Sequence, residues 1–486
     1  MITVKNPFSG EVVAEVPYAT KREIAFALER AAAAFKVWKN SRAYERSELL
    51  TRVANLISKG RKEYIDLLCR EAGKPVRFAE MEFDRSVHSI RWGAAEAGRF
   101  NGEMLRPDVE NFGRLGFGIN SRMPRGPVLG VVPFNWPLLC PLHKVVPAVA
   151  VGAPCILKPS IFTPITSLRI AEAFRECGAP EGLVQCVVAN DEDSANLTRA
   201  PEIAFISFTG STRVGNIIRT QAPEKPQCME LGGNGWVGIL PDVNPELFPA
   251  ITRRLVATGY GQSGQGCLSV QNVAVWHKQG QEFITMLRKA VEDIPYGDTT
   301  SPDVVSGPSI NVAAATRIRA AIDEASKSWE VVRSKNPVGK PASECEVQVI
   351  PPALLLQKTL PVDDAIVTEE LFGPVMNVLT FEGVDQFLNQ VNSSRYGLQT
   401  GIFTDHWPTI QHLYRELQTG ALNVNDTTAL KYDHAPFGGV KDSGSGREGI
   451  RAAMDDMTEG KFLAIGSAVP FAAPETALRR PPAYAE

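Results

Sequence analysis

The sequence predicts an α/β protein, because short apolar strands alternate with amphipathic helices twice along the chain. Strand-like runs near 128–133, 155–159, 183–188 and 203–208 each precede a helix-like segment, and a second alternation covers about 234–435. Repeats of this kind form βαβ units, in which helices cover both faces of a parallel sheet. The length of 486 residues further indicates two or three domains.

The region before the first alternation is predicted to be mainly helical, after two short strands within 3–16. Thr20 and Glu23 have the spacing of a capping box, in which each side chain accepts the other residue's backbone N–H, so a helix should begin there. Helical periodicity returns over about 44–71 and 75–102.

The remaining elements follow from the same periodicities. A further strand is expected at 118–123, and helices at 138–151, 163–177, 192–199 and from Ser211. In the second alternation we expect strands near 236–239, 270–276, 365–367 and 375–381, and helices near 247–261, 279–292, 312–327 and 408–418. Pro- and Ala-rich residues from about 467 onward are expected to form an extended tail.

Composition and charge exclude several classes of protein. A hydrophobic content of 44% and a charged content of 22% are typical of globular proteins, and a net charge of −3 gives no reason to expect nucleic acid or an anionic membrane as a partner. We expect neither a membrane-spanning helix nor a signal peptide. The eight cysteines lack the spacing of a zinc site, so we expect reduced thiols, no metal and a cytoplasmic location.

A thiol stands at the end of the glycine-rich stretch Gly261–Cys267. Small residues let a substrate approach sulfur, and the two glutamines and free N–H groups of this stretch could face the oxyanion that forms when Cys267 attacks a carbonyl. Glu230, beside Gly232 and Gly233, is a candidate base. Taken alone, Cys267 would be better interpreted as a buried, inert cysteine.

Two further motifs stand where predicted strands end. Phe208–Gly215 joins a strand to a helix whose first N–H groups could bind phosphate, although the spacing is not G-x-G-x-x-G, and a turn capped by Ser211 explains it equally well. Lys158 could bind a ribose or phosphate oxygen at the edge of the same sheet. The alternative for Lys158 is a solvated surface lysine.

Asn135, within Pro133–Pro137, could donate to an oxyanion, or could simply be a turn residue between prolines. The acidic pair of Glu369–Val375 could serve a ligand, or could simply favour a helix start through the helix dipole.

In their order along the chain, these motifs together with Pro436–Gly439 resemble the aldehyde dehydrogenase superfamily, whose NAD(P)-dependent members oxidise aldehydes to acids. The resemblance covers Asn6 to about Ile465. It implies a Rossmann-like cofactor-binding domain, an α/β catalytic domain and a bridging β oligomerisation arm, in a homodimer or homotetramer. The implied boundaries are 1–106 and 126–232 for the cofactor domain, 233–436 for the catalytic domain, 107–125 and 455–470 for the arm, and 471–486 for the tail.

The resemblance also implies the catalytic roles. Cys267 would attack the aldehyde, while Asn135 and the Cys267 N–H hold the oxyanion. Hydride would then leave for the nicotinamide, and Glu230 would activate the water that hydrolyses the resulting thioester. The implied cofactor-binding residues are Phe134, Trp136, Lys158, Ser160, Gly210, Ser211, Gly215, Leu231, Gly232, Glu370 and Phe372.

The expected cofactor preference is inferred from one departure from the family pattern, and the expected substrate preference from individual residues, most of them cationic. Many NAD-preferring members have a ribose-binding Glu where this chain has Ile161, so NADP should be accepted beside NAD. The implied substrate residues are Arg85, His143, Gly266 and Phe437. With Lys431 and His434 they favour a small polar or anionic aldehyde of the lactaldehyde, phosphorylated-glyceraldehyde or semialdehyde type, although each cation could instead form a structural salt bridge.

Two alternatives remain at this point. A coenzyme A-acylating relative would pass the thioester to a thiol instead of water, but such members tend to lack the base that Glu230 provides. A catalytically silent binding or structural relative is opposed by the intact set of Cys267, Glu230, Asn135 and Lys158.

Overall fold

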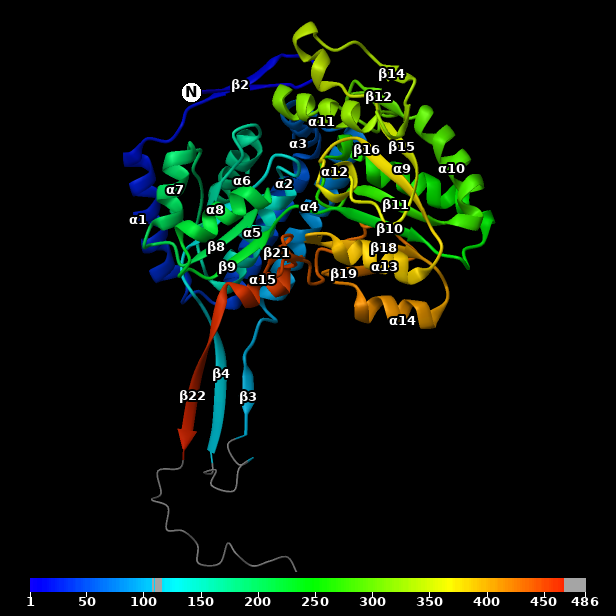
Figure 1. The fold of residues 1–486 in the computed structure, drawn as a ribbon. Helices are drawn as coiled ribbons and strands as arrows, with labels where there is room; N and C mark the ends of the chain where they lie inside the picture. Colours follow the sequence, from blue (N-terminus) through cyan, green and yellow to red (C-terminus); the bar gives the residue numbers. More distant parts are fainter. Residues whose placement is uncertain (107–108, 110–115, 467–486) are drawn as a thin grey trace, which may run out of the picture.

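The computed structural model describes residues 1–106, 109 and 116–466 as two lobes, each built on a sheet, with a three-stranded arm that projects from them (Figure 1). The predicted extended tail from 467 and most of 107–115 lie outside the described residues. No helix of the described part is long and apolar enough to cross a membrane.

The N-terminal region is mainly helical, as predicted. The capping box of Thr20 and Glu23 is present, and the predicted helix over 44–71 is divided at Gly60. The elements are the antiparallel pair β1 (Ile2–Lys5) and β2 (Val12–Val16), followed by α1 (Lys21–Trp38), α2 (Ala43–Lys59), α3 (Arg61–Ala72) and α4 (Val76–Ala97).

The first sheet has five parallel strands in the order β9, β8, β5, β6, β7, with the short β21 antiparallel to β9 at one edge. The strand order reverses between β5 and β8, and the crevice outside the carboxyl ends at such a point is where open α/β sheets bind ligands. The bounds are β5 (Val128–Val131), α5 (Leu139–Val151), β6 (Cys155–Lys158), α6 (Pro164–Glu176), β7 (Val184–Cys186), α7 (Asp191–Arg199), β8 (Phe205–Thr209), α8 (Thr212–Gln221), β9 (Gln227–Glu230) and β21 (Gly444–Ser445).

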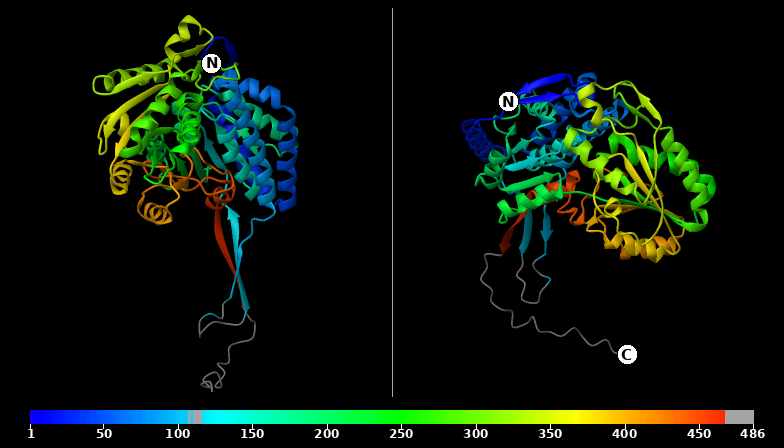
Figure 2. Two further views of the ribbon diagram at one scale, coloured as in Figure 1. Left: turned by 90° about the vertical axis from the view of Figure 1, so that its right-hand side faces the viewer. Right: turned by 45° about the horizontal axis from the view of Figure 1, so that its top comes forward.

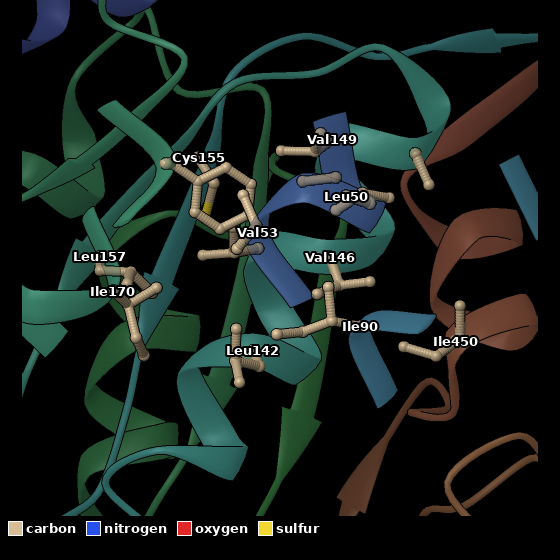
Figure 3. Close-up of a cluster of buried hydrophobic side chains, with 14 of the residues drawn as sticks. Leu50, Val53, Ile90, Leu142, Val146, Val149, Cys155, Leu157, Ile170 and Ile450 are labelled. Atoms are coloured by element: carbon tan, nitrogen blue, oxygen red, sulfur yellow. The ribbon is translucent and has the colours of Figure 1, made fainter. Parts of the chain in front are cut away.

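Helix α5 is buried all round and holds the first lobe together. Leu142 and Val146 of α5 pack with Leu50 of α2 and Ile90 of α4, and Ile450 of α15 (Ile450–Asp456) closes the cluster (Figure 3). Burial of each such side chain contributes roughly 1.5–3 kcal/mol. The loop before α5, which carries Asn135, therefore starts from a rigid support.

The second sheet has the strand order β13, β15, β16, β11, β10, β18, β19, and only β13 is antiparallel to its neighbour. Figure 2 shows this lobe beside the first, with helices on both faces of the sheet. Its elements are β10 (Gly235–Ile239), α9 (Phe248–Tyr260), β11 (Val270–Trp276), α10 (His277–Glu292), β12 (Pro295–Gly297), α11 (Val312–Ala325), β13 (Glu330–Arg333), β14 (Asn336–Val338), β15 (Ala353–Thr359), α12 (Ala365–Thr368), β16 (Val375–Phe381), α13 (Val384–Ser393), β17 (Tyr396–Gly397), β18 (Gln399–Phe403), α14 (Trp407–Glu416), β19 (Ala421–Val424) and β20 (Val440–Lys441).

The predicted strand at 365–367 is wrong, because this segment is the short helix α12. Periodicity does not separate a short buried strand from one helical turn. Here tertiary contacts decide the conformation: Gln271 and Asn377 donate to the carbonyl of Ile366, while Asn234 and Asn272 donate to that of Val367.

The projecting arm is the three-stranded sheet of β3 (Glu103–Leu105), β4 (Gly116–Pro124) and β22 (Thr458–Gly466). Residues from the end of the chain thus pair with residues before β5, in continuous antiparallel register from Thr458 opposite Pro124 to Gly466 opposite Gly116. The strand expected at 118–123 is confirmed within β4.

Candidate active site

The candidate site lies where the carboxyl edge of the first sheet meets the amino edge of the second. Glu230 ends β9, whereas Cys267 precedes β11. Two glycines permit the close approach of the two edges: a Cβ at Gly233 would collide with the carbonyl of Cys267, and one at Gly232 with the carboxylate of Glu370.

The turn before Cys267 is held in an uncommon conformation. Gln262 and Ser263 have left-handed φ values of 52° and 61°, which typically cost of order 1–3 kcal/mol each unless the surroundings impose them. The Ser263 hydroxyl donates to the Gly307 carbonyl, and the Gln265 amide donates to the Pro308 carbonyl at 3.2 Å. These bonds hold the backbone N–H of Cys267 in place before any ligand arrives.

The expectation that both glutamines face the adduct is wrong for Gln265, whose side-chain amide donates to the carbonyls of Gln262 and Pro308. The side-chain amide of Gln262 donates to the backbone carbonyl of Asn135. The side-chain oxygen Oε1 of Gln265 accepts the backbone N–H of Ile310 at 2.9 Å. Both amides are used to fix the turn, and Gln262 ties it to the loop after β5.

The structure places Asn135 beside the Cys267 turn. Its amide nitrogen donates to the Gln265 carbonyl at 2.8 Å, and the side chain is buried. A side-chain amide carries two hydrogens, so one remains available to an oxyanion. The Cys267 thiol is partly buried; burial raises its pKa, and the nearby ammonium of Lys431 lowers it.

Glu230 is buried and stands close to the same thiol. Neither of its carboxylate oxygens has a hydrogen-bond partner in the described part of the chain, and burial, with a smaller contribution from Glu448, raises its pKa well above the usual range. A Cβ at Gly438 would lie 2.8 Å from one of these oxygens, so the glycine leaves the carboxylate room. A buried, unpaired carboxylate with a raised pKa is suited to accept a proton from water.

Behind Glu230 lies a group of charged side chains that sequence reasoning only partly found, which we call the buried ion cluster. Glu448 accepts from Lys144 and from the Thr209 hydroxyl at 3.0 Å, and Lys431 approaches its other oxygen at 3.3 Å. Lys144 could have been noticed as a lysine within the apolar helix α5, whereas Glu448 gave no signal. The cluster consists of Arg85, His143, Lys144, Lys431, Asp433 and Glu448.

The structure gives Arg85 and His143 partners within this cluster. Arg85 binds Asp433 through two hydrogen bonds of 2.7 and 3.2 Å, and His143 together with Arg85 holds the pKa of Asp433 well below its usual range despite its burial. His143 is buried, with its ring nitrogens 3.3 Å from Asp433 and 3.6 Å from Glu448. Arg85 therefore does not present an unbalanced charge.

The crevice at the carboxyl edge of the first sheet has the groups that a dinucleotide needs. Lys158 ends β6, its pKa is lowered by burial, and its ammonium has no hydrogen-bond partner among the described residues. Ser211 caps α8 by accepting the Val214 N–H at 3.4 Å, leaving Gly210 and the helix start at the crevice. Gly215 has a packing role, because a Cβ there would collide with Leu231.

Glu370 and Phe372 reach the site from the amino edge of the second sheet. Glu370 accepts the Gly233 N–H at 2.9 Å, and burial raises its pKa to about 7. Phe372, with φ of 53°, places its ring 6.1 Å from that of Phe134. These residues, with the unpaired Lys158, fit a nicotinamide dinucleotide.

The other predicted residues fall around this crevice. Ser160 accepts the Phe162 N–H at 3.3 Å, and Ile161 is 36% exposed. Trp136 lies under the cations of Lys74 and Arg85, at 4.0 and 5.5 Å from its ring centre. Of the two remaining residues, Gly266 is half-buried and Phe437 is buried.

A thiol beside a buried carboxylate and an amide donor, facing a dinucleotide-type crevice, defines the class of an oxidoreductase with a cysteine nucleophile. Comparison with known proteins identifies the family: the model of the aldehyde dehydrogenase family matches residues 1–463, and this chain belongs to that family.

Relatives and solved structures of the same kind match over most of the chain. The 3-sulfolactaldehyde dehydrogenase of Priestia aryabhattai is 31% identical, over 95% of this chain and 94% of that protein. Aldehyde dehydrogenase 21 of Physcomitrella patens, solved with the product succinate, is 31% identical with a TM-score of 0.89, over 97% and 96% of the two chains. An NADP-dependent glyceraldehyde-3-phosphate dehydrogenase of Bacillus halodurans, solved with NADP, is 28% identical with a TM-score of 0.89, over 96% and 95%.

Proposed function

We propose that this aldehyde dehydrogenase oxidises a small polar or anionic aldehyde to the carboxylic acid, with NAD or NADP as cosubstrate. The observation that carries the proposal is the convergence of Cys267, Asn135 and Glu230 at the junction of the two sheets. The relatives named above act on sulfonated, carboxylated or phosphorylated small molecules, according to their names, and this supports the substrate class.

The chain's own groups supply the nucleophile, the oxyanion donors and the base of the reaction. The Cys267 thiolate forms a C–S bond to the aldehyde carbon, and the Asn135 amide with the Cys267 N–H holds the resulting oxyanion. Bound NAD or NADP supplies the hydride acceptor, after which the carbon is a thioester. Glu230 takes a proton from water as the water oxygen attacks; the C–S bond then breaks and the acid leaves.

In the proposed cofactor site, Lys158 and Glu370 hold the two ribose units, and the start of α8 holds the pyrophosphate. Ile161 places no carboxylate against a ribose 2′-phosphate, which supports acceptance of NADP as well as NAD.

We further assign the arm to subunit contacts in a homodimer or homotetramer. Exposed apolar side chains gather on it, which favours burial against another copy, and they include Met104, Leu105, Phe117, Met123, Phe462, Leu463 and Ile465. The proposed domain division is that of the sequence analysis, except that β3 belongs to the arm, and that β21 and α15 belong to the first lobe. The eight free cysteines are consistent with a reducing, cytoplasmic location.

Initial rates with NAD and with NADP test the proposal on lactaldehyde, glyceraldehyde 3-phosphate, succinic semialdehyde and hexanal. We expect the polar and anionic aldehydes to exceed hexanal at least about tenfold in kcat/KM, which is about 1.4 kcal/mol of transition-state discrimination. The product should be the free acid with or without coenzyme A. A preference for hexanal would contradict the substrate class, and an acyl-coenzyme A product would contradict hydrolysis by Glu230.

A further inference from the structure

The segment that leads from Thr428 to Phe437 crosses the candidate site from the thiol to the base. At one end, the Thr428 hydroxyl donates to the carbonyl of Leu268, the residue after Cys267, at 2.7 Å. At the other end, the Phe437 N–H donates to the Glu448 carbonyl at 2.9 Å, next to the glycine that packs on Glu230. Lys431 lies between these two anchors.

Lys431 is held at this place by two contacts. Its ammonium is 3.3 Å from a Glu448 oxygen and 3.6 Å from the ring centre of Phe437, and its side chain is 11% exposed. An ammonium over an aromatic face with little exposure is fixed in direction and poorly screened by water. It therefore acts as a localised charge beside the thiol.

The charges of the buried ion cluster do not cancel. With Glu230 protonated, because burial raises its pKa, and leaving His143 aside, three cations (Arg85, Lys144 and Lys431) face two carboxylates (Asp433 and Glu448). Arg85 is balanced by Asp433, and Lys144, which is fully buried, is bound to Glu448. Lys431 shares a carboxylate that is already neutralised, so the surplus positive charge resides on Lys431.

We propose that Lys431 binds the anionic group of the aldehyde substrate, so that this chain selects small aldehydes carrying a carboxylate, sulfonate or phosphate. The cation expected from the sequence at Arg85 is satisfied internally, and Lys431 takes that role. An anion that meets Lys431 gains a charge-assisted hydrogen bond at a partly dehydrated site, whereas an apolar tail would leave the surplus charge uncompensated. The selection among aldehyde substrates rests on the proposed function, whereas the binding of an anion at Lys431 does not depend on it.

The test compares two alkylating agents that differ in charge alone. Iodoacetate and iodoacetamide both form an S–C bond with the Cys267 thiolate and release iodide, so the ratio of their rates cancels the thiolate population and reports the local field. We expect Lys431→Met to lower the iodoacetate-to-iodoacetamide ratio at Cys267 roughly fivefold or more, and Lys431→Arg to preserve it. Mass spectrometry of the modified peptides reads the rates, with Cys177 as an internal reference. Lys335→Met is the control variant: it removes one positive charge from a surface ion pair with Glu292, and it should leave the alkylation ratio at Cys267 unchanged.

Kinetics with succinic semialdehyde and its neutral methyl ester complete the test. Because Lys431 also lowers the pKa of the Cys267 thiol, Lys431→Met should slow the oxidation of both aldehydes, but kcat/KM for the anionic aldehyde should fall roughly tenfold to a hundredfold further than that for the ester, mainly through KM. An unchanged alkylation ratio, an equal change in Lys335→Met, or a parallel loss for both aldehydes would overturn the proposal. If the wild type oxidises neither aldehyde while the ratio still depends on Lys431, the proposed function fails and the anion site stands.

Discussion

The two sheets of this protein are both doubly wound, but they present opposite edges to the site. In the first sheet the candidate residues follow the strands: Asn135 follows β5, Lys158 ends β6 and Glu230 ends β9. In the second sheet they precede the strands, with Cys267 before β11 and Glu370 before β16. The rule that ligands bind at carboxyl edges therefore describes only half of this site.

The difference has a physical origin in how each edge satisfies its polar groups. The carboxyl edge of the first sheet leaves the Lys158 ammonium without a hydrogen-bond partner among the described residues. At the carboxyl edge of the second sheet, Asp242 accepts from the Thr404 hydroxyl at 2.7 Å and from the backbone N–H groups of Asp405 and His406. These hydrogen bonds fix the loops after β10 and β18 around a pocket that contains none of the candidate residues, whereas the amino edge of this sheet faces the first sheet.

Removal of the nucleophile should have the largest effect on activity, because Cys267 is the reactive group that the second sheet contributes to the site. Cys267→Ala is expected to lower kcat/KM roughly 10⁴-fold or more in steady-state assays of aldehyde oxidation. Cys177→Ser, which changes another partly buried thiol, should retain activity. Comparable losses in the two variants would mean that Cys267 is not the nucleophile.

Removal of the base tests the first sheet. Glu230→Gln should lower kcat about 10²–10⁴-fold. Since burial raises the pKa of Glu230, the wild-type rate should rise with pH as this carboxyl loses its proton, and the variant should be flat over the same range. Pre-steady-state kinetics should show formation of the thioester preserved and its hydrolysis slowed. A wild-type rate that falls through this range would exclude the assigned role.

Glu370 tests the contact between the two sheets, because it precedes a strand of the second sheet and its side chain reaches the cofactor crevice of the first. Glu370→Gln should raise the Kd for NAD or NADP about tenfold in titrations of protein fluorescence. The native pKa of about 7 lies above the unfolded value of 4.5, so the buried carboxyl favours folding below pH 4.5, and this contribution is lost as pH rises through about 7.

In Glu370→Gln the stability of the protein should accordingly depend less on pH between these two values than in the wild type. Thermal unfolding measured at several pH values checks this difference. Identical pH dependence in both proteins would show that the Glu370 carboxyl is not buried in the free enzyme.

The smallest effect is expected from the polar ladder that supports the amino edge of the second sheet. Asn272 donates to Asn234 and to the Val367 carbonyl at 3.0 Å, and accepts from Asn377 at 2.8 Å. Asn272→Leu removes these three bonds and leaves the buried Asn234 side-chain oxygen unpaired, so it should destabilise the protein by about 1–3 kcal/mol. The apparent midpoint of thermal unfolding should fall by several degrees, whereas Gln281→Leu on the exposed face of α10 should leave it nearly unchanged.

Much of the fold was accessible from periodicity and local chemistry. The capping box of Thr20 and the strand–helix alternation of the first lobe depend on neighbours in the chain, so local rules predict them. The conformation of α12 was mispredicted because four side-chain amides from β11, β16 and the segment before β10 determine where its carbonyls point.

The sequence by itself determined the α/β class, the family resemblance and the set of reactive groups, because these are properties of residue type and order. Only the tertiary structure decided which groups meet. It assigned Gln262 and Gln265 to the turn, paired Arg85 with Asp433, and left the surplus charge on Lys431. Charge balance and hydrogen-bond satisfaction depend on contacts between residues distant in the chain, which no local pattern encodes.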